Sequence, residues 1–222
     1  MIATVAERWR PRAFAAWALH ASTFWGLACV PIAMVFSILS AYRLSQTVHV
    51  DDIVFGPTRS AIVDTLLLAI GVERTAVLVY VLQRSFDALV VAAALTPIFL
   101  WLLGSSAIHA AARIRGLRGR PYRPLLVLFG YAELVYQLPT SLAGIAFAGG
   151  PLTPLADVVS VVMLVWLAVV VHRAIELHYG VSGDQALAIF ILGALAFYLL
   201  PLILIGILLV AIVVAAAILQ YF

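Results

Sequence analysis

Two stretches of this chain are too long and too apolar to fold in contact with water. Residues 13–42 and residues 185–222 contain no Asp, Glu, Lys or Arg. As an α-helix rising about 1.5 Å per residue, the second stretch would extend about 57 Å, whereas the hydrocarbon core of a bilayer is about 30 Å thick. Both stretches are therefore predicted to cross a membrane. The first also exceeds the apolar region of a cleavable signal peptide, which has about 7–15 residues.

The composition excludes several classes of protein. The 222 residues are 65% hydrophobic and 10% charged, so a water-soluble globule would lack the polar surface that it needs. All 13 basic residues are Arg, which excludes Walker A phosphate loops and lysine Schiff bases. Cys29 is the single cysteine, so neither an intrachain disulfide nor a CxxC site can form.

Hydropathy predicts an all-α integral membrane bundle in one domain, residues 1–222. Residues 62–82 are apolar except for a few groups that include the adjacent Glu73 and Arg74, and a charge pair at the bilayer midplane costs several kcal/mol. We therefore expect this segment to be an interfacial or re-entrant helical segment. Pro201 should kink or break the last span. The five predicted spans are residues 13–42, 88–112, 124–147, 152–171 and 185–222.

The distribution of Arg predicts the orientation. Cytoplasmic loops of membrane proteins carry an excess of basic residues. With five spans and a cytoplasmic N-terminus, nine Arg lie on the cytoplasmic side, whereas a sixth span would move the richest loop across the membrane. We expect a multi-pass protein of the cell membrane, and the absence of Lys favours a GC-rich bacterial gene and hence the bacterial inner membrane. The nine are Arg8, Arg10, Arg12, Arg113, Arg115, Arg118, Arg120, Arg123 and Arg173.

The second half of the chain carries an ordered set of short motifs. They are His109-Ala-Ala-Ala-Arg113, then Arg115-Gly-Leu-Arg-Gly-Arg120, then Gly130-Tyr131-Ala132, and finally His178-Tyr-Gly-Val-Ser182. Over about residues 88–215 this order resembles the Yip1 domain family, in particular its bacterial branch. The resemblance implies a five-helix membrane fold, and eukaryotic members of the family work in membrane trafficking with small GTPases. It supplies no catalytic residue, and Glu133 departs from the family pattern, which places a proline soon after the Gly-Tyr pair.

A polar stripe is predicted on the span 124–147. Glu133 lies ten residues beyond Arg123, about 15 Å along a helix and therefore near the bilayer midplane. Tyr136, Gln137 and Thr140 share its helical face at i+3, i+4 and i+7. Three roles are open for Glu133: a neutral carboxylic acid that hydrogen-bonds another helix, a proton or ion site, or a contact for a partner subunit.

Five histidine and glutamate side chains form a candidate metal or haem site. His172 and Glu176 are at i and i+4 on one helical face, a separation that suits two metal ligands. The alternative is that these side chains sit at helix ends, where they meet the helix dipole and the headgroups. The remaining candidates are His178, His109 and His20.

The basic loop has three possible roles. It can set the topology, contact anionic lipid or phosphate, or dock a protein partner, since guanidinium groups bind phosphate bidentately. The loop does not favour nucleic acid as a partner, because no aromatic platform accompanies it. The candidate lipid or partner contacts are Arg113, Arg115, Arg118, Arg120 and Arg123.

Together with the resemblance to the Yip1 family, these patterns favour a non-enzymatic multi-pass membrane scaffold, or an assembly or trafficking-type protein, that contacts lipids and other membrane proteins. The alternatives are an accessory subunit of a larger membrane complex and a proton- or ion-linked transporter that uses Glu133. No cofactor is predicted, and no set of nucleophile, base and acid occurs at a recognised spacing.

Overall fold

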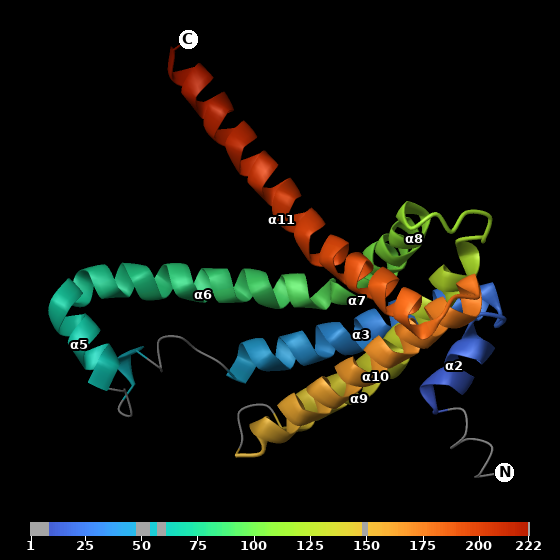
Figure 1. Cartoon of the computed structure of the whole chain (residues 1–222). Helices are drawn as coiled ribbons and strands as arrows, with labels where there is room; N and C mark the ends of the chain where they lie inside the picture. Colours follow the sequence, from blue (N-terminus) through green and yellow to red (C-terminus); the bar gives the residue numbers. More distant parts are fainter. Residues whose placement is uncertain (1–8, 48–53, 57–60, 148–150, 222) are drawn as a thin grey trace. The chain divides into compact units, whose positions relative to one another are not determined.

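A computed structural model describes residues 9–47, 54–56, 61–147 and 151–221, with side chains in the last helix described as far as Ile203. The described residues form helices and contain no β-strand, which confirms the all-α prediction (Figure 1). Within the described residues, six helices are long and apolar enough to cross a membrane, so the chain is a multi-pass membrane protein. These spans are Thr23–Thr47, Glu73–Ala92, Thr96–Ile114, Arg123–Phe147, Thr153–Tyr179 and Gly183–Ile203.

The helices follow one another with short connections. In chain order they are α2 (Pro11–Ala18), α3 (Thr23–Thr47), α5 (Ala61–Ile70), α6 (Val72–Ala94), α7 (Thr96–Phe99), the π-helical turn η1 (Leu100–Gly104), α8 (Ser105–Ile114), α9 (Arg123–Phe147), α10 (Thr153–Tyr179) and α11 (Gly183–Tyr221).

A first span is confirmed within residues 13–42, but its predicted start is wrong, because two helices occupy this segment. α2 ends at Ala18, and α3 begins at Thr23 with the Gly26 N–H donating to the carbonyl of Ser22 at 3.0 Å. Serine is a favoured residue just before a helix. A polar signal inside the apolar run therefore divides the segment, and α3 is the part that has spanning length.

The predicted start of the second span at residue 88 is also wrong. Asp87 was expected to precede a new helix, but its carboxylate accepts a hydrogen bond from Gln83 at 3.0 Å and lies 3.9 Å from the Arg84 guanidinium. These i−4 and i−3 partners hold Asp87 inside α6. The break comes at Leu95, just before the segment that contains Pro97, so residues 73–92 form a sixth helix of spanning length.

Two further boundaries differ from the prediction. α10 continues to Tyr179 rather than ending near residue 171, and the ion pair between Arg173 and Glu176 lies within its added turns. α11 runs without interruption through Pro201 to Tyr221, so the proline does not break this helix (Figure 1). An interfacial or re-entrant helical segment was expected at residues 62–82. Instead, α5 and α6 meet there at Gly71, whose φ of +84° is readily adopted by glycine, and α6 continues as a helix of spanning length.

The chain divides into two compact units. Unit 1 contains residues 1–27, 99–132 and 167–222, and unit 2 contains residues 28–98 and 133–166. α3, α9 and α10 each contribute residues to both units. The arrangement of the whole chain as one membrane domain stays a prediction.

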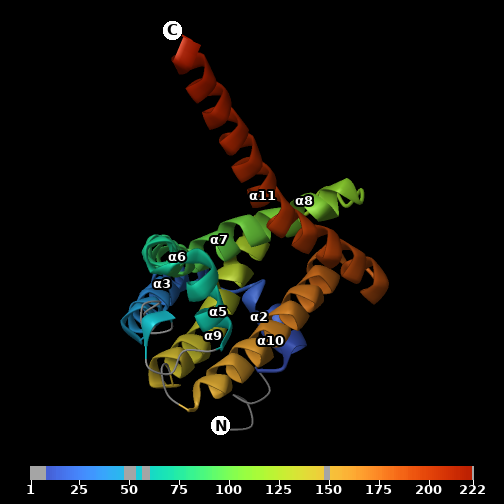
Figure 2. The same ribbon diagram turned by 90° about the vertical axis from the view of Figure 1, so that its left-hand side faces the viewer.

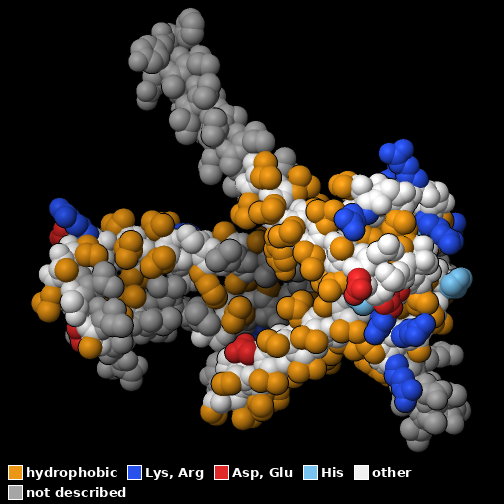
Figure 3. Space-filling view, viewed as in Figure 1, with side chains coloured by type: hydrophobic (Ala, Val, Ile, Leu, Met, Phe, Trp, Pro, Cys, Tyr) orange, Lys and Arg blue, Asp and Glu red, His pale blue; other side chains and the backbone are white. Residues whose placement is uncertain are grey.

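Apolar side chains dominate the exposed surface of the spanning helices, as the bilayer requires (Figure 3). In α10 the exposed residues include Val158, Val161, Val162, Leu164 and Val165. Lipid tails solvate such an apolar surface. Because the tails are as apolar as the helices, the helices associate in the bilayer through close packing.

Glycines provide that close packing inside unit 1. A Cβ atom at Gly130 of α9 would overlap the backbone carbonyl of Gly26 in α3, so the two backbones touch at this point. α8 lies beside the first part of α11 (Figures 1 and 2), and a Cβ atom at Gly193 would be 2.5 Å from the side chain of Ile108. Glycine at these positions permits the close approach of the helices.

We predict that Gly130→Ala destabilises unit 1 by about 1–3 kcal/mol, because the added methyl group forces α9 away from α3. The measurement is thermal unfolding of the purified protein in mild detergent. Ala110→Leu, on an exposed position of α8, is the matched control and should unfold like the wild type. Equal unfolding temperatures for Gly130→Ala and the control would contradict the close contact.

Candidate functional site: a polar pocket in unit 2

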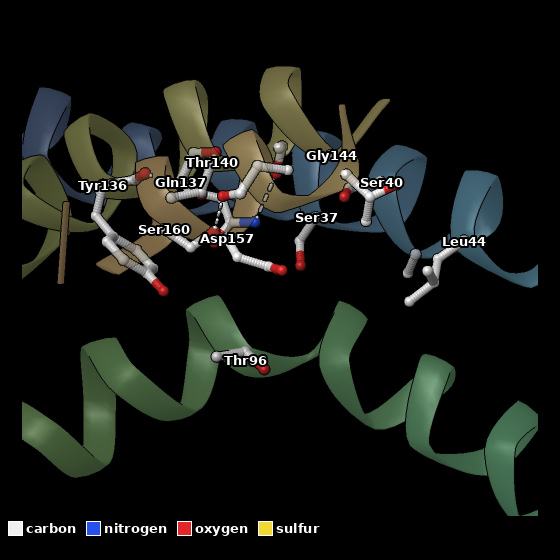
Figure 4. Close-up of a pocket in the computed structure, with 14 residues that line it drawn as sticks. Ser37, Ser40, Leu44, Thr96, Tyr136, Gln137, Thr140, Gly144, Asp157 and Ser160 are labelled. Atoms are coloured by element: carbon white, nitrogen blue, oxygen red, sulfur yellow. Dashed lines mark hydrogen bonds between the residues drawn. The ribbon is translucent and has the colours of Figure 1, made fainter. Parts of the chain in front are cut away.

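Unit 2 contains a pocket of about 520 Å³, and most of the residues that line it have a polar side chain although the surrounding helices are apolar (Figure 4). Helices α3, α7, α9 and α10 form its walls, close to where α9 ends and α10 begins. It is lined by Ser37, Ser40, Ala41, Leu44, Thr96, Tyr136, Gln137, Thr140, Ser141, Gly144, Thr153, Ala156, Asp157 and Ser160.

Helical spacing collects these polar residues on facing surfaces. In α10, Thr153, Asp157 and Ser160 are at i, i+4 and i+7, which places them on one side of the helix. In α3, Ser37 and Ser40 are separated by three residues and also face one direction. Because each helix carries its polar groups on a single stripe, packing the stripes together directs the polar groups toward the pocket and leaves the apolar faces outside.

Hydrogen bonds within each helix fix several of the lining side chains. The Thr140 hydroxyl donates to the carbonyls of Tyr136 and Gln137, each at 3.0 Å, and the Ser160 hydroxyl donates to Ala156 at 2.9 Å. The amide of Gln137 donates to the hydroxyl of Ser141 at 2.7 Å. These bonds orient the hydroxyl oxygens and leave acceptor lone pairs for an occupant of the pocket.

Asp157 determines the electrostatic character of the pocket. It is exposed, and it makes no hydrogen bond or ion pair with any described residue. The lining contains no Arg, Lys or His. The pocket therefore presents one carboxylate among hydroxyl and amide groups, which favours a cation or a hydrogen-bond donor over an anion.

The residues of the predicted polar stripe on α9 do not all line the pocket. Tyr136, Gln137 and Thr140 line the pocket, whereas Glu133 does not. The side chain of Glu133 is buried, with 1% of the residue exposed, and neither carboxyl oxygen has a hydrogen-bond partner. Gln137 lies one helical turn further along α9, so this orphaned carboxyl is adjacent to the pocket along the helix.

The sequence prediction missed the α3 and α10 sides of the pocket. Asp157, Ser37, Ser40 and Ser160 were not among its candidate residues. Their signal is the same i, i+3, i+4, i+7 spacing of polar residues that identified Tyr136, Gln137 and Thr140 on α9. Applying this spacing to the other spans would have found them, but the sequence alone does not show that the three stripes meet.

The candidate metal ligands point to different partners. Glu176 accepts two bonds from Arg173, at 2.9 and 2.8 Å, and the ring of His172 contacts the Gly183 carbonyl at 3.1 Å. His109 bonds the hydroxyl of Tyr179 at 2.8 Å. Across the ranges that the structure describes, no three His, Cys, Asp or Glu residues form a group that could hold a metal ion. His20 and His178 are brought together beside a second, smaller pocket in unit 1.

The five arginines of the α8–α9 loop are all exposed on the surface of unit 1. Arg123 is fixed by a bond from its Nε to the Thr23 hydroxyl at 2.8 Å. Gly116 and Gly119 take φ values of +85° and +97°, so glycine suits both turns of the loop. Arg115 and Arg120 each line a small pocket, and Arg113, Arg118 and Arg123 line neither of these two pockets.

Comparison with known proteins yields no relative: no family model matches the chain, and neither the curated proteins nor the solved structures contain a match. The resemblance to the Yip1 family therefore has no support from the comparisons. The chain is an all-α, multi-pass membrane protein, and its candidate function is argued from its own residues.

We predict that Glu133→Leu raises the free energy of unfolding by about 1–3 kcal/mol, because it removes a buried carboxyl group that has no partner. Thermal unfolding in detergent measures this effect. Gln137→Leu is the matched control on the same helix, and it should destabilise by about 1 kcal/mol because it leaves the buried Ser141 without its bond. A large loss of stability in Glu133→Leu would instead assign Glu133 a structural role.

Proposed function

We propose that this protein is a non-enzymatic membrane protein that binds a small organic ammonium ion in the polar pocket of unit 2. The observation that carries the proposal is Asp157, an unpaired carboxylate in a lining that otherwise consists of hydroxyl, amide and small apolar groups. A primary ammonium group offers three donors and a positive charge, and hydroxyl oxygens can accept the donors that Asp157 leaves free.

The lining also favours a ligand that carries a hydroxyl group beside its charge. Ser37, Ser40, Thr96 and Thr140 present hydroxyl groups on several sides, and each can donate as well as accept. Tyr136 adds an aromatic ring, which attracts cations. The described lining residues include no cysteine nucleophile and no histidine to activate a hydroxyl group, and for this reason binding rather than catalysis is proposed.

Glu133 supports a link between this binding and ion movement. It lies one helical turn from Gln137, is buried, and has no hydrogen-bond partner, which is a costly arrangement in a packed bundle. Intramembrane carboxyl groups with these properties are candidates for proton or ion sites. The transporter alternative drawn from the sequence thus gains a second carboxyl group near the pocket.

The test uses ethanolamine, which has one ammonium and one hydroxyl group, with the purified full chain in detergent. We expect ethanolamine to bind and to raise the unfolding temperature, while glycerol and acetate do not. Asp157→Asn should weaken ethanolamine binding about 10–100-fold, since a hydrogen bond to a charged group contributes about 1.5–3 kcal/mol. Calorimetric titration measures the affinity.

Asp184→Asn is the control for that experiment. Asp184 is an exposed aspartate in the first turn of α11, in unit 1 and outside the pocket. Its substitution changes the net charge by the same amount and should leave ethanolamine binding unchanged. Equal weakening by both substitutions, or binding of acetate in place of ethanolamine, would refute the proposal.

A second candidate function, an assembly scaffold or accessory subunit, is favoured by α6. Glu73, Val77, Tyr80 and Arg84 are exposed and share one face of this helix at i, i+4, i+7 and i+11. The Arg84 guanidinium lies 5.4 Å from the centre of the Tyr80 ring. Lipid tails offer Glu73 no partner, whereas a membrane-spanning helix with polar groups of its own could provide one. This role does not depend on the Yip1 resemblance.

A photocrosslinking amino acid at Val77 tests the second candidate in the native membrane. We expect a protein adduct of constant mass at Val77. The control position is Val161 of α10, because Val161 is 60% exposed and Val77 is 65% exposed. The polar face of α6 predicts an adduct at Val77 that does not form at Val161. Identical patterns at both positions would contradict a specific partner.

A further inference from the structure

A second pocket lies wholly within unit 1 and has the opposite chemical character. It has a volume of about 310 Å³, and its walls come from α2 and the turn after it, from the end of the α8–α9 loop with the start of α9, and from the end of α10. It is lined by Ala16, Leu19, His20, Arg120, Pro121, Pro124, Leu177 and His178.

The polar groups of this pocket are one guanidinium and two imidazoles. Arg120 is always charged and offers a planar set of donors that matches the oxygens of a phosphate group. His178 bonds the Pro121 carbonyl through Nε2 at 3.0 Å, and His20 bonds the Ala16 carbonyl through Nδ1 at 2.9 Å. The second ring nitrogen of each histidine has no partner among the described residues. Because the first nitrogen donates to a carbonyl, the second can donate to an anionic occupant when the ring is protonated.

No carboxylate opposes these groups. The lining contains neither Asp nor Glu. Glu176, two residues before His178, directs both of its oxygens to the Arg173 guanidinium. The pocket therefore has a positive potential that its own residues do not neutralise, and an anion is the occupant that its charge favours.

The loop backbone places one particular arginine in this pocket. Gly119 precedes Arg120 and has a φ of +97°, a conformation that side chains with a Cβ rarely adopt. The bond from His178 to Pro121 fastens the residue after Arg120 to the end of α10. Arg118 is exposed two residues earlier and does not line the pocket, although it belongs to the same loop.

The remaining walls are apolar. Ala16, Leu19, Pro124 and Leu177 provide a surface that suits glycerol or the first carbons of acyl chains. The pocket also lies where α10 ends and α9 begins, at the ends of two spanning helices, which is the depth of the headgroups in a bilayer. An ester of phosphate with an apolar substituent matches both kinds of wall.

We propose that this pocket binds the phosphate group of a phosphate ester, with Arg120 as the bidentate partner and His20 and His178 as the flanking contacts. The apolar walls favour an anionic phospholipid as its source. The site is independent of the ammonium pocket of unit 2, because the two share no residue.

The test measures binding to the purified full chain in detergent by native mass spectrometry and by calorimetric titration. The probes are short-chain phosphatidylglycerol, glycerol phosphate, and a diacylglycerol of the same chain length. We expect phosphatidylglycerol to bind and diacylglycerol not to bind, since the latter lacks phosphate. Binding of glycerol phosphate as tight as that of phosphatidylglycerol would keep the phosphate site and assign its source to a soluble ester.

The variants distinguish phosphate binding in this pocket from nonspecific attraction of the phosphate to the basic loop. Arg120→Gln should weaken phosphatidylglycerol binding about tenfold or more, and Arg120→Lys should weaken it less because it keeps the charge but loses the bidentate geometry. His20→Ala should also weaken binding. Arg118→Gln, the matched control from the same loop, should bind like the wild type.

Equal losses in Arg118→Gln and Arg120→Gln would overturn the proposal, because they would show attraction to the net charge of the loop. Equal binding of diacylglycerol and phosphatidylglycerol would overturn it as well. Helical circular dichroism and monodisperse elution establish that each variant is folded, and Arg120→Lys keeps the test decisive if Arg120→Gln does not fold.

Discussion

Lipid tails provide no hydrogen-bond partners, and every polar group in the spanning helices of this chain has to be satisfied inside the protein or left exposed at a cost. Most spanning helices meet this constraint with apolar outer faces and backbone bonds within the helix. The polar side chains are collected on narrow stripes. The hydroxyl groups of Thr140 and Ser160 donate hydrogen bonds to carbonyls of the preceding helical turn. These side chains are therefore compatible with the bilayer while their oxygen atoms line a pocket.

The polar groups that have no partner among the described residues of the protein mark the candidate sites. Glu133 is buried without a partner, and Asp157 is an unpaired carboxylate in a pocket of hydroxyl groups. In unit 1, Arg120 and two histidines surround a pocket without any acid. The two pockets have opposite charge, and each lies within one unit. A protein that retains such costly groups gains no stability from them, which is the physical reason to look for ligands there.

Much of the fold follows from the order of apolar and polar residues. The spans 124–147 and 152–171 agree closely with the starts of α9 and α10, because long uncharged runs allow few alternatives in a bilayer. The errors came at polar residues whose role depends on local partners. Asp87 resembled the start of a helix until its bonds to Gln83 and Arg84 placed it inside α6, and Ser22 resembled part of a span although it precedes α3.

The sequence by itself determined that the chain crosses a membrane several times, that its basic residues cluster in one loop, and that Glu133, Tyr136, Gln137 and Thr140 share a helical face. Those properties depend on hydropathy and on the 3.6-residue period of one helix, which the order of residues specifies directly. Only the tertiary structure decided that Asp157 joins Thr140 in one pocket, that Arg120 rather than Arg118 meets His20 and His178, and that Glu133 is left without a partner. These properties depend on which helix faces pack together, and contacts between residues far apart in the chain cannot be read from local spacing.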